Sequence, residues 1–266
     1  MTKSILVPVE PVVPPAPYLG GKRYLAGRII ERIAAVPHNS YVEPFVGMGG
    51  VFLRRPFKAT AEVINDINGD VATLFRVLQR HYLALMDMLR WQITSRDEFE
   101  RLVATNGETL TDLERAARFL YVQRVSFGGR VRSPNFGVAK ARPARFDVAT
   151  LGPVLEDIHR RLSGVVIERL DWEALVPRYD APGTLYYLDP PYFGCERDYG
   201  DGVFERADFE RMAAVLGALK GRFIMSLDAS PEVRRIFRRF QIEEVETTYT
   251  VARGGGKRVT ELLISG

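Results

Sequence analysis

The stretch Leu185-Tyr186-Tyr187-Leu188-Asp189-Pro190-Pro191-Tyr192-Phe193 decides the fold. Its apolar half is short, β-prone and preceded by the breaker at 181–183, which predicts a buried strand. Pro190 and Pro191 cannot continue a β-ladder, so this strand must end where Asp189 emerges. In a parallel α/β sheet, ligands bind at the carboxyl ends of the strands. We therefore expect Asp189 and the aromatic residues after it at the edge of a ligand site.

Composition sets limits on the class of protein. The 266 residues are 46% hydrophobic and 26% charged, with a net charge of +4 and a pI of about 9.2. This weak basic excess is compatible with a polyanionic partner without proving one. The single Cys195 excludes an internal disulfide or a cysteine-based zinc cluster and favours a reducing compartment. With only three histidines as well, we expect no metal and no membrane span. Residues 5–17, interrupted by prolines, should form an extended arm.

Alternating strands and helices fill both ends of the chain. Strands are expected at 41–45, 61–64, 165–168, 185–188 and 223–227, with helices at 25–33, 70–89, 154–162 and 209–219. Residues 242–251 and 259–264 alternate around a glycine turn and predict a terminal β-hairpin. The pattern predicts an α/β fold with a doubly wound, mostly parallel sheet. Residues 1–90 and 151–266 would form the catalytic and cofactor-binding domain.

The βα rhythm stops between residues 91 and 150, which we interpret as a mainly helical insertion. Helices are expected at 97–103 and 110–125. The segment 126–137 then shows turn chemistry without periodicity and continues into a run of basic residues. A loop this long inside a compact chain is functional or disordered.

Acidic residues follow four of the expected strands. They are Glu43, Asp66, Asp171 and Asp189. A glycine turn, Gly47-x-Gly49, follows the first strand and permits close approach of a ligand to the backbone. Asp66 is placed to bind ribose hydroxyls, as in nucleotide-binding folds. Capping of the next helix is the alternative role for Asp66 and Asp171, although four such acids together are harder to explain as caps.

The cofactor class follows from what the sequence lacks. It contains no phosphate-loop lysine–serine pair, which disfavours a nucleoside triphosphate. It also shows no acid–histidine–nucleophile grouping. An adenosine cofactor without phosphate fits better, and S-adenosyl-L-methionine is the expected one.

Four motifs, at 20–22, 43–49, 65–68 and 189–192, together resemble the Dam-type (D12 class) adenine-specific DNA methyltransferases. Segments 119–124 and 256–264 support the resemblance, and the matches follow the family order along nearly the whole chain. The resemblance implies a Rossmann-like methyltransferase fold with an inserted target-recognition region. It implies transfer of a methyl group from S-adenosyl-L-methionine to adenine N6 in double-stranded DNA, with the base flipped out of the duplex.

The resemblance also implies roles for single residues. Tyr18 and Lys22 would hold the methionine end of the cofactor, Asp66 its ribose, and Asp171 would lie near its adenine. The residues expected to bind the cofactor are Tyr18, Lys22, Glu43, Phe45, Gly47, Gly49, Asp66, Ile67, Asp171 and Asp189. The expected catalytic residues are Asp189, Pro190 and Tyr192. The Asp189 carboxylate and the Pro190 carbonyl would accept the two amine hydrogens of adenine, and Tyr192 would stack on the flipped base.

Target recognition is assigned to the basic part of the insertion and to the terminal hairpin. The expected DNA-binding residues are Arg124, Phe127, Arg130, Arg132, Asn135, Lys140, Arg142, Arg253, Lys257 and Arg258. A solvated loop is the alternative. Relatives that methylate GATC carry an aromatic-Asn-Gly-Leu-x-Arg pattern, whereas residues 127–132 read Phe-Gly-Gly-Arg-Val-Arg. The sequence therefore does not predict GATC as the target, although Arg132 is placed to read a guanine edge.

Rival functions remain open at this point. A cytosine-N4 methyltransferase usually has Ser in place of Asp189, and a protein-glutamine methyltransferase favours Asn there. An RNA methyltransferase or a DNA-binding homologue without turnover are the others. We expect a monomer in the cytoplasm, encoded by a bacterium or a phage, with a cognate restriction endonuclease as a candidate partner.

Overall fold

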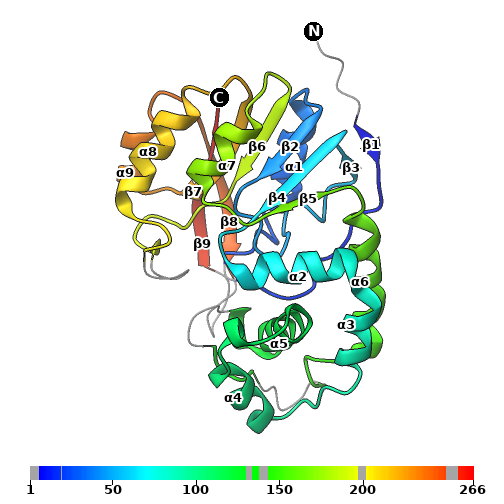
Figure 1. Cartoon of the computed structure of the whole chain (residues 1–266). Coiled ribbons are helices and arrows are strands. Elements are labelled where there is room, and N and C mark those ends of the chain that lie inside the picture. Colours follow the sequence, from blue (N-terminus) through cyan, green and yellow to red (C-terminus); the bar gives the residue numbers. More distant parts are fainter. Residues whose placement is uncertain (1–5, 19, 130–133, 138–142, 197–201, 250–256) are drawn as a thin grey trace.

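A seven-stranded sheet forms the centre of the computed structural model, which describes residues 6–18, 20–129, 134–137, 143–196, 202–249 and 257–266 (Figure 1). The strand order is β5-β4-β2-β6-β7-β9-β8. The strands are β2 Ser40–Glu43, β4 Ala61–Asn65, β5 Val166–Glu168, β6 Thr184–Leu188, β7 Arg222–Asp228, β8 Gln241–Tyr249 and β9 Lys257–Ser265. In the described part of this sheet, the two pairs made by β9 are antiparallel and the other pairs are parallel. The predicted doubly wound sheet with a terminal hairpin is confirmed.

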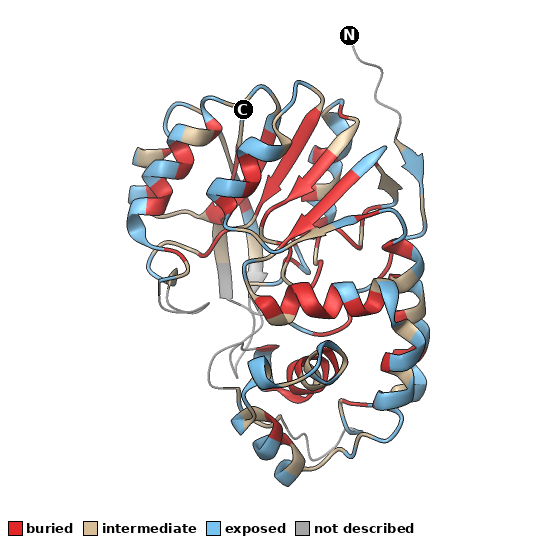
Figure 2. Cartoon of the chain, in the orientation of Figure 1, coloured by how far each residue is buried: buried red, intermediate tan, exposed pale blue. Residues whose placement is uncertain are grey.

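Helices cover both faces of this sheet because side chains on each strand alternate between two cores. Tyr41 packs with α1 (Ala26–Ala35) and α2 (Gly69–Arg80), whereas its neighbour Val42 packs with α7 (Trp172–Tyr179), α8 (Arg206–Leu216) and α9 (Pro231–Ile236). The same division separates Tyr187 from Tyr186 on β6. Figure 2 shows the central strands as almost entirely buried, which explains their nearly continuous apolar sequence.

Three helices of the middle region, α3 (Tyr82–Leu89), α5 (Asp112–Val125) and α6 (Val148–Arg161), pack on α2, and the fourth, α4 (Arg96–Ala104), packs on α5. The Thr111–Glu114 capping box starts α5, and its buried residues join the core that α2 shares with the sheet. Short 3-10 turns lie at Gly107–Thr109 and Phe127–Gly129.

Two helix predictions were wrong in detail, and two helices, α7 and α9, were not predicted. The single helix expected at 70–89 is two helices, because the backbone breaks at His81 with φ −128° and ψ 31°. Helix α6 begins at Val148 rather than at 154, since the Asp147 side chain caps it by accepting from the amide of Ala149. Helix α7 was not predicted, although Asp171 supplies its cap.

The chain reverses its direction of winding between the neighbouring strands β2 and β6. From β2 it proceeds outward to β4 and β5, and it then returns through β6 to β7. Such a switch point leaves a crevice at the carboxyl ends of the strands. Glu43 ends β2 and Asp189 directly follows β6, so both acids lie at this crevice.

The N-terminal arm is extended and lies along the sheet domain. β1 (Val7–Pro8) pairs with β3 (Phe57–Lys58), and the Val12 amide donates to the Leu53 carbonyl at 2.8 Å.

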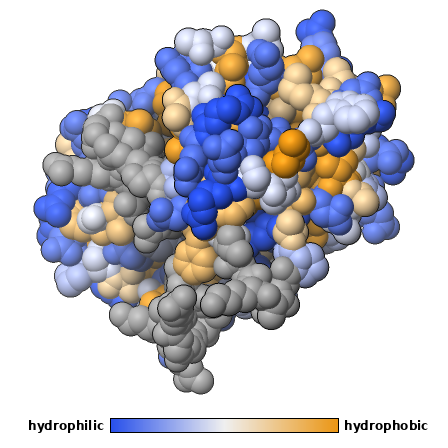
Figure 3. Space-filling view, turned by 90° about the horizontal axis from the view of Figure 1, so that it is seen from below, coloured by the Kyte–Doolittle hydropathy of each residue, from blue (hydrophilic) through white to orange (hydrophobic). Residues whose placement is uncertain are grey.

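The surface mixes hydrophilic and hydrophobic areas on the face shown in Figure 3. Leu83, Trp91 and Ile93 are among the exposed large apolar side chains. Across the described residues, no helix is long and apolar enough to cross a membrane.

Candidate active site

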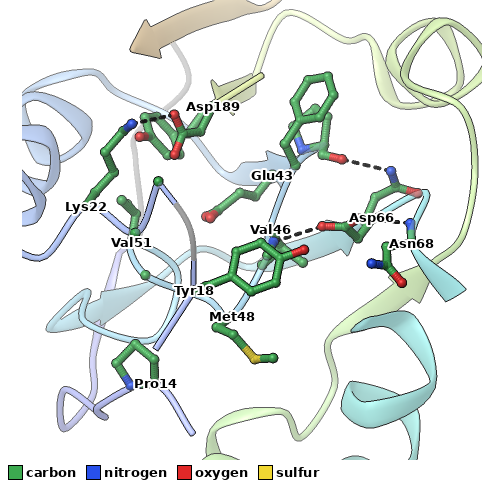
Figure 4. A pocket seen from close by; sticks show the side chains of 18 of the residues that line it. Pro14, Tyr18, Lys22, Glu43, Val46, Met48, Val51, Asp66, Asn68 and Asp189 are labelled. Carbon is green, nitrogen blue, oxygen red and sulfur yellow. Dashed lines mark hydrogen bonds and ion pairs between the residues drawn. The ribbon is translucent and has the colours of Figure 1, made fainter. Parts of the chain in front are cut away.

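A cavity of about 710 Å³ opens at the carboxyl edge of the sheet, at the switch point between β2 and β6. Its walls come from the arm, from the glycine turn after β2, and from the residues that follow β4, β5 and β6. In Figure 4, Lys22 and Asp189 meet at one end of the cavity, Asp66 and Asn68 lie at another, and Tyr18 lies between them. The predicted cofactor residues that line it are Tyr18, Lys22, Glu43, Phe45, Gly47, Asp66, Ile67, Asp171 and Asp189.

Gly49 is the predicted cofactor residue that does not line the cavity. Its φ is +74°, and a Cβ there would lie 2.8 Å from the Leu53 side chain. The glycine is therefore required for packing of the turn. Gly47 does line the cavity, and a Cβ there would lie 3.0 Å from two ring atoms of Tyr18.

Asp66 is held by the backbone at the cavity wall. Its Oδ2 accepts from the Gly47 amide at 2.9 Å, and its Oδ1 accepts from the Asn68 amide at 2.9 Å (Figure 4). Burial raises the pKa of Asp66 to about 6, and these two hydrogen bonds oppose the rise. The alternative role as a helix cap does not hold, because Asn68 caps α2.

Asp171 caps a helix and also lines the cavity. Its side chain caps α7 by accepting from the Glu173 amide at 2.8 Å. The same residue lines the cavity beside Leu170 and Trp172.

Glu43 is a buried acid inside the cavity. The Tyr41 hydroxyl donates to its Oε2 at 2.6 Å. Burial raises the pKa of Glu43 to about 8, with the Tyr41 hydrogen bond and the charge of Arg55 opposing.

Asp189 is fixed through one of its two oxygens. Oδ1 lies 2.8 Å from the Lys22 ammonium and accepts from the Ser226 hydroxyl at 2.9 Å. Ser226 in turn lies 2.8 Å from the hydroxyl of the buried Tyr187. Burial raises the pKa of Asp189, whereas Lys22 and Ser226 oppose the rise. Lys22 and Ser226 thus both contact the same carboxylate oxygen, Oδ1.

Lys22 is buried and contacts protein side chains, whereas the sequence analysis gave it a role only toward the cofactor. It is 4% exposed, and it donates to the Tyr192 hydroxyl at 2.5 Å as well as pairing with Asp189. Glu261 on β9 lies 3.7 Å away. The ammonium therefore lies against the predicted catalytic carboxylate, and Lys22 is one of the residues that line the cavity.

Tyr192 and Pro190 lie beside the cavity rather than in its wall. Pro191 is the proline of this motif that lines the cavity. The Lys22 ammonium lies 4.4 Å from the centre of the Tyr192 ring, so this ring is positioned by the same cation that binds Asp189.

The predicted DNA-binding residues fall into two groups. Arg124 is partly buried, lines the cavity, and donates to the carbonyls of Pro15 and Arg145, whereas Phe127 is 53% exposed and Asn135 is also exposed. Arg130, Arg132, Lys140, Arg142 and Arg253 lie outside the described residues. Lys257 and Arg258 belong to β9, but their side chains are likewise not described.

Several residues of the site had no role in the sequence analysis. Arg23, Arg54, Trp172 and Phe204 line the cavity, and Ser226 binds Asp189. The sequence did contain a signal for Ser226. This residue lies near the end of the apolar strand β7, which pairs with β6, the strand that leads to Asp189. Among the described residues, no group of three or more His, Cys, Asp or Glu side chains is arranged to hold a metal ion.

Residues 18–251 match the family model described as D12 class N6 adenine-specific DNA methyltransferase. The type II methyltransferase M1.LlaDCHI of Lactococcus lactis subsp. cremoris is 28% identical over 271 residues, covering 93% of each chain. The type II methyltransferase M.CviBI of Paramecium bursaria Chlorella virus NC1A is 20% identical, covering 82% of this chain and 84% of that protein. A DNA adenine methylase of Vibrio cholerae serotype O1 is 24% identical, covering 92% and 93%.

Proposed function

The chain belongs to the D12 class of N6 adenine-specific DNA methyltransferases, and we propose that it transfers the methyl group at the cavity between β2 and β6. It is an enzyme that methylates adenine N6 in DNA. The observation that carries the assignment of the site is the fixed carboxylate of Asp189, held by Lys22 and Ser226 at the cavity edge.

The cavity fits S-adenosyl-L-methionine in size and chemistry. Its volume of about 710 Å³ lies within the range of cofactor pockets. The Asp66 oxygens, each holding one amide, retain lone pairs for the ribose hydroxyls. Trp172 and Asp171 would flank the adenine. Lys22, Arg23 and Arg54 are cationic lining residues that would attract the carboxylate of the methionine end.

The residues around Asp189 then activate the target amine. S-adenosyl-L-methionine supplies an electron-poor methyl group on a sulfonium. The adenine amine is a weak nucleophile because its lone pair is delocalised into the ring. If Asp189 Oδ2 and the Pro190 carbonyl accept its two hydrogens, the nitrogen can turn its lone pair toward the methyl group.

The target base must leave the duplex to reach this site. A base inside the stack cannot approach Asp189, so we propose base flipping with Tyr192 as the stacking face. The exposed Phe127 and Asn135, with the basic residues named above, are proposed to bind double-stranded DNA.

Methyl transfer from labelled cofactor to defined duplexes tests this function, with the modified base identified by mass spectrometry. We expect N6-methyladenine in double-stranded DNA. Methylated cytosine, or label in RNA alone, would contradict the proposal. Binding of DNA with no transfer to any duplex would favour the homologue without turnover.

The Ser226 hydroxyl should contribute to turnover by positioning Asp189. Loss of a hydrogen bond to a charged acceptor costs about 1.5–3 kcal/mol. We therefore expect Ser226→Ala to lower kcat by roughly 10-fold to 100-fold while leaving the KM for the cofactor within about twofold. Ser163→Ala, at an exposed serine, is the control. An unchanged kcat would show that Lys22 alone positions Asp189.

Cofactor binding should depend on pH through Asp66. The pKa is raised to about 6, so the folded protein gains a proton as pH falls through 6, and a neutral carboxyl is a weaker acceptor for hydroxyls. Calorimetry at pH 7 and pH 5 should show weaker binding at pH 5 for the wild type. Asp66→Asn should bind about tenfold more weakly at pH 7 and should show no such fall. Equal pH dependence of the two proteins would remove Asp66 from the ribose site.

A further inference from the structure

The arm forms one wall of the cofactor cavity and positions Tyr18. Residues Val13, Pro14, Ala16, Pro17 and Tyr18 all line the cavity. The Tyr18 ring packs on Gly47, where even a single added carbon would come within 3.0 Å of the ring. A displacement of the arm at Pro17 or Tyr18 would therefore change the shape of the cavity.

Backbone hydrogen bonds to the sheet domain hold the beginning of the arm. The Val9 amide donates to the Pro56 carbonyl at 3.0 Å, and the Val12 amide donates to the Leu53 carbonyl at 2.8 Å. Beyond Val12, the described contacts of the arm's backbone carbonyls with side chains come from the end of α5 in the insertion.

These contacts are made by Gln123 and Arg124. The Gln123 side chain, 1% exposed, donates to the carbonyls of Pro17 and Gly129, both at 3.3 Å. Arg124 donates to the Pro15 carbonyl at 3.1 Å. One buried amide group thus joins the arm to the segment that follows α5.

Gly129 packs directly against the arm. Its φ is +66°, and a Cβ there would lie 2.8 Å from the Pro17 carbonyl carbon and 2.8 Å from the Tyr18 nitrogen. The same segment is tied to residues 135–136, because Ser126 forms an isolated β-bridge with Phe136 and the Phe127 amide donates to the Asn135 carbonyl. The proposed DNA-contacting residues Phe127 and Asn135 are therefore linked to Tyr18 through Gly129.

We infer that Gln123 and Gly129 are positioning residues through which the DNA-contacting segment sets the place of Tyr18, and that cofactor and DNA binding are thereby coupled. This inference rests on the proposed function, since it requires the cofactor in this cavity. Coupling between two binding sites is reciprocal, so a duplex that moves residues 126–129 must change the affinity for S-adenosyl-L-methionine.

Gly128 supplies a matched control for Gly129. Its φ is +73°, and a Cβ there would meet nothing within 4 Å. Alanine at either position carries the same kind of backbone strain, because both residues have positive φ. Only alanine at 129 pushes against Pro17 and Tyr18.

The experiment measures binding of S-adenosyl-L-homocysteine, the cofactor without its transferable methyl group, by calorimetry for the wild type, Gly129→Ala and Gly128→Ala, so that no transfer occurs during the titration. Each titration is carried out once without DNA and once with a short duplex that the wild type methylates. We expect Gly129→Ala to raise the Kd at least fivefold without DNA, and Gly128→Ala to stay within twofold. The wild-type Kd should change when the duplex is present, and this change should shrink in Gly129→Ala.

Equal effects of the two alanines, or a wild-type Kd that the duplex does not change, would overturn the inference. A wild type that binds no cofactor would instead overturn the proposed function. If Gly129→Ala does not fold, Gln123→Leu decides the matter, because it removes the donors without adding bulk. A raised KM for the cofactor with kcat retained at saturation supports positioning, whereas a wild-type KM contradicts it.

Discussion

Asp189→Asn should lower the rate of methyl transfer by about 10³-fold or more while cofactor binding survives within a few fold. Asparagine has one acceptor oxygen in place of two, and Lys22 and Ser226 already bind one carboxylate oxygen. If the amide oxygen keeps these partners, its NH₂ group faces the amine of the base as a donor. The amine then lacks the acceptor that frees its lone pair.

Single-turnover transfer to a duplex and calorimetry with S-adenosyl-L-methionine separate the two effects. Asp157→Asn, at an exposed position on α6, controls for the change of charge. A variant that keeps more than about a tenth of the rate would show that the Pro190 carbonyl is the main acceptor.

Strand ends were the most predictable part of the molecule. Two prolines stopped β6 at Asp189, and a short apolar strand led to Asp66, so local chemistry determined which side chains reach the carboxyl edge. The sequence also predicted the hairpin, from two alternating segments around a glycine turn. Strand ends and hairpins depend on residues that lie close together in the sequence.

Contacts between distant segments could not be predicted in the same way. Ser226 binds Asp189 across 37 positions, and Arg124 reaches Pro15 across 109. Because Arg124 lies near a basic stretch, the sequence predicted that it contacts DNA. Only the folded structure shows that its guanidinium donates to backbone carbonyls. The prediction of one long helix at 70–89 was wrong, because the apolar periodicity continues through His81 whereas the helical backbone conformation ends there.

Glu62 is another residue whose role only the fold reveals. It is 5% exposed on β4, between Arg55 at 0% and Arg161 at 7%. Its Oε1 accepts from Arg55 at 2.6 Å, and its Oε2 accepts from Arg161 at 2.6 Å. The Arg55 guanidinium also lies 3.6 Å from the centre of the Tyr41 ring. The cluster thus joins β4 to α6.

Glu62→Gln should destabilise the folded protein by about 3–5 kcal/mol, because it leaves two buried arginines without a negative partner. Urea unfolding followed by circular dichroism measures this, with Glu31→Gln on the exposed face of α1 as the control. Replacing all three residues by apolar side chains of similar volume should restore much of the loss, since desolvation of the ions then no longer opposes folding. A loss below about 1 kcal/mol for Glu62→Gln would mean that the aromatic rings around Arg55 and Arg161 already compensate their charge.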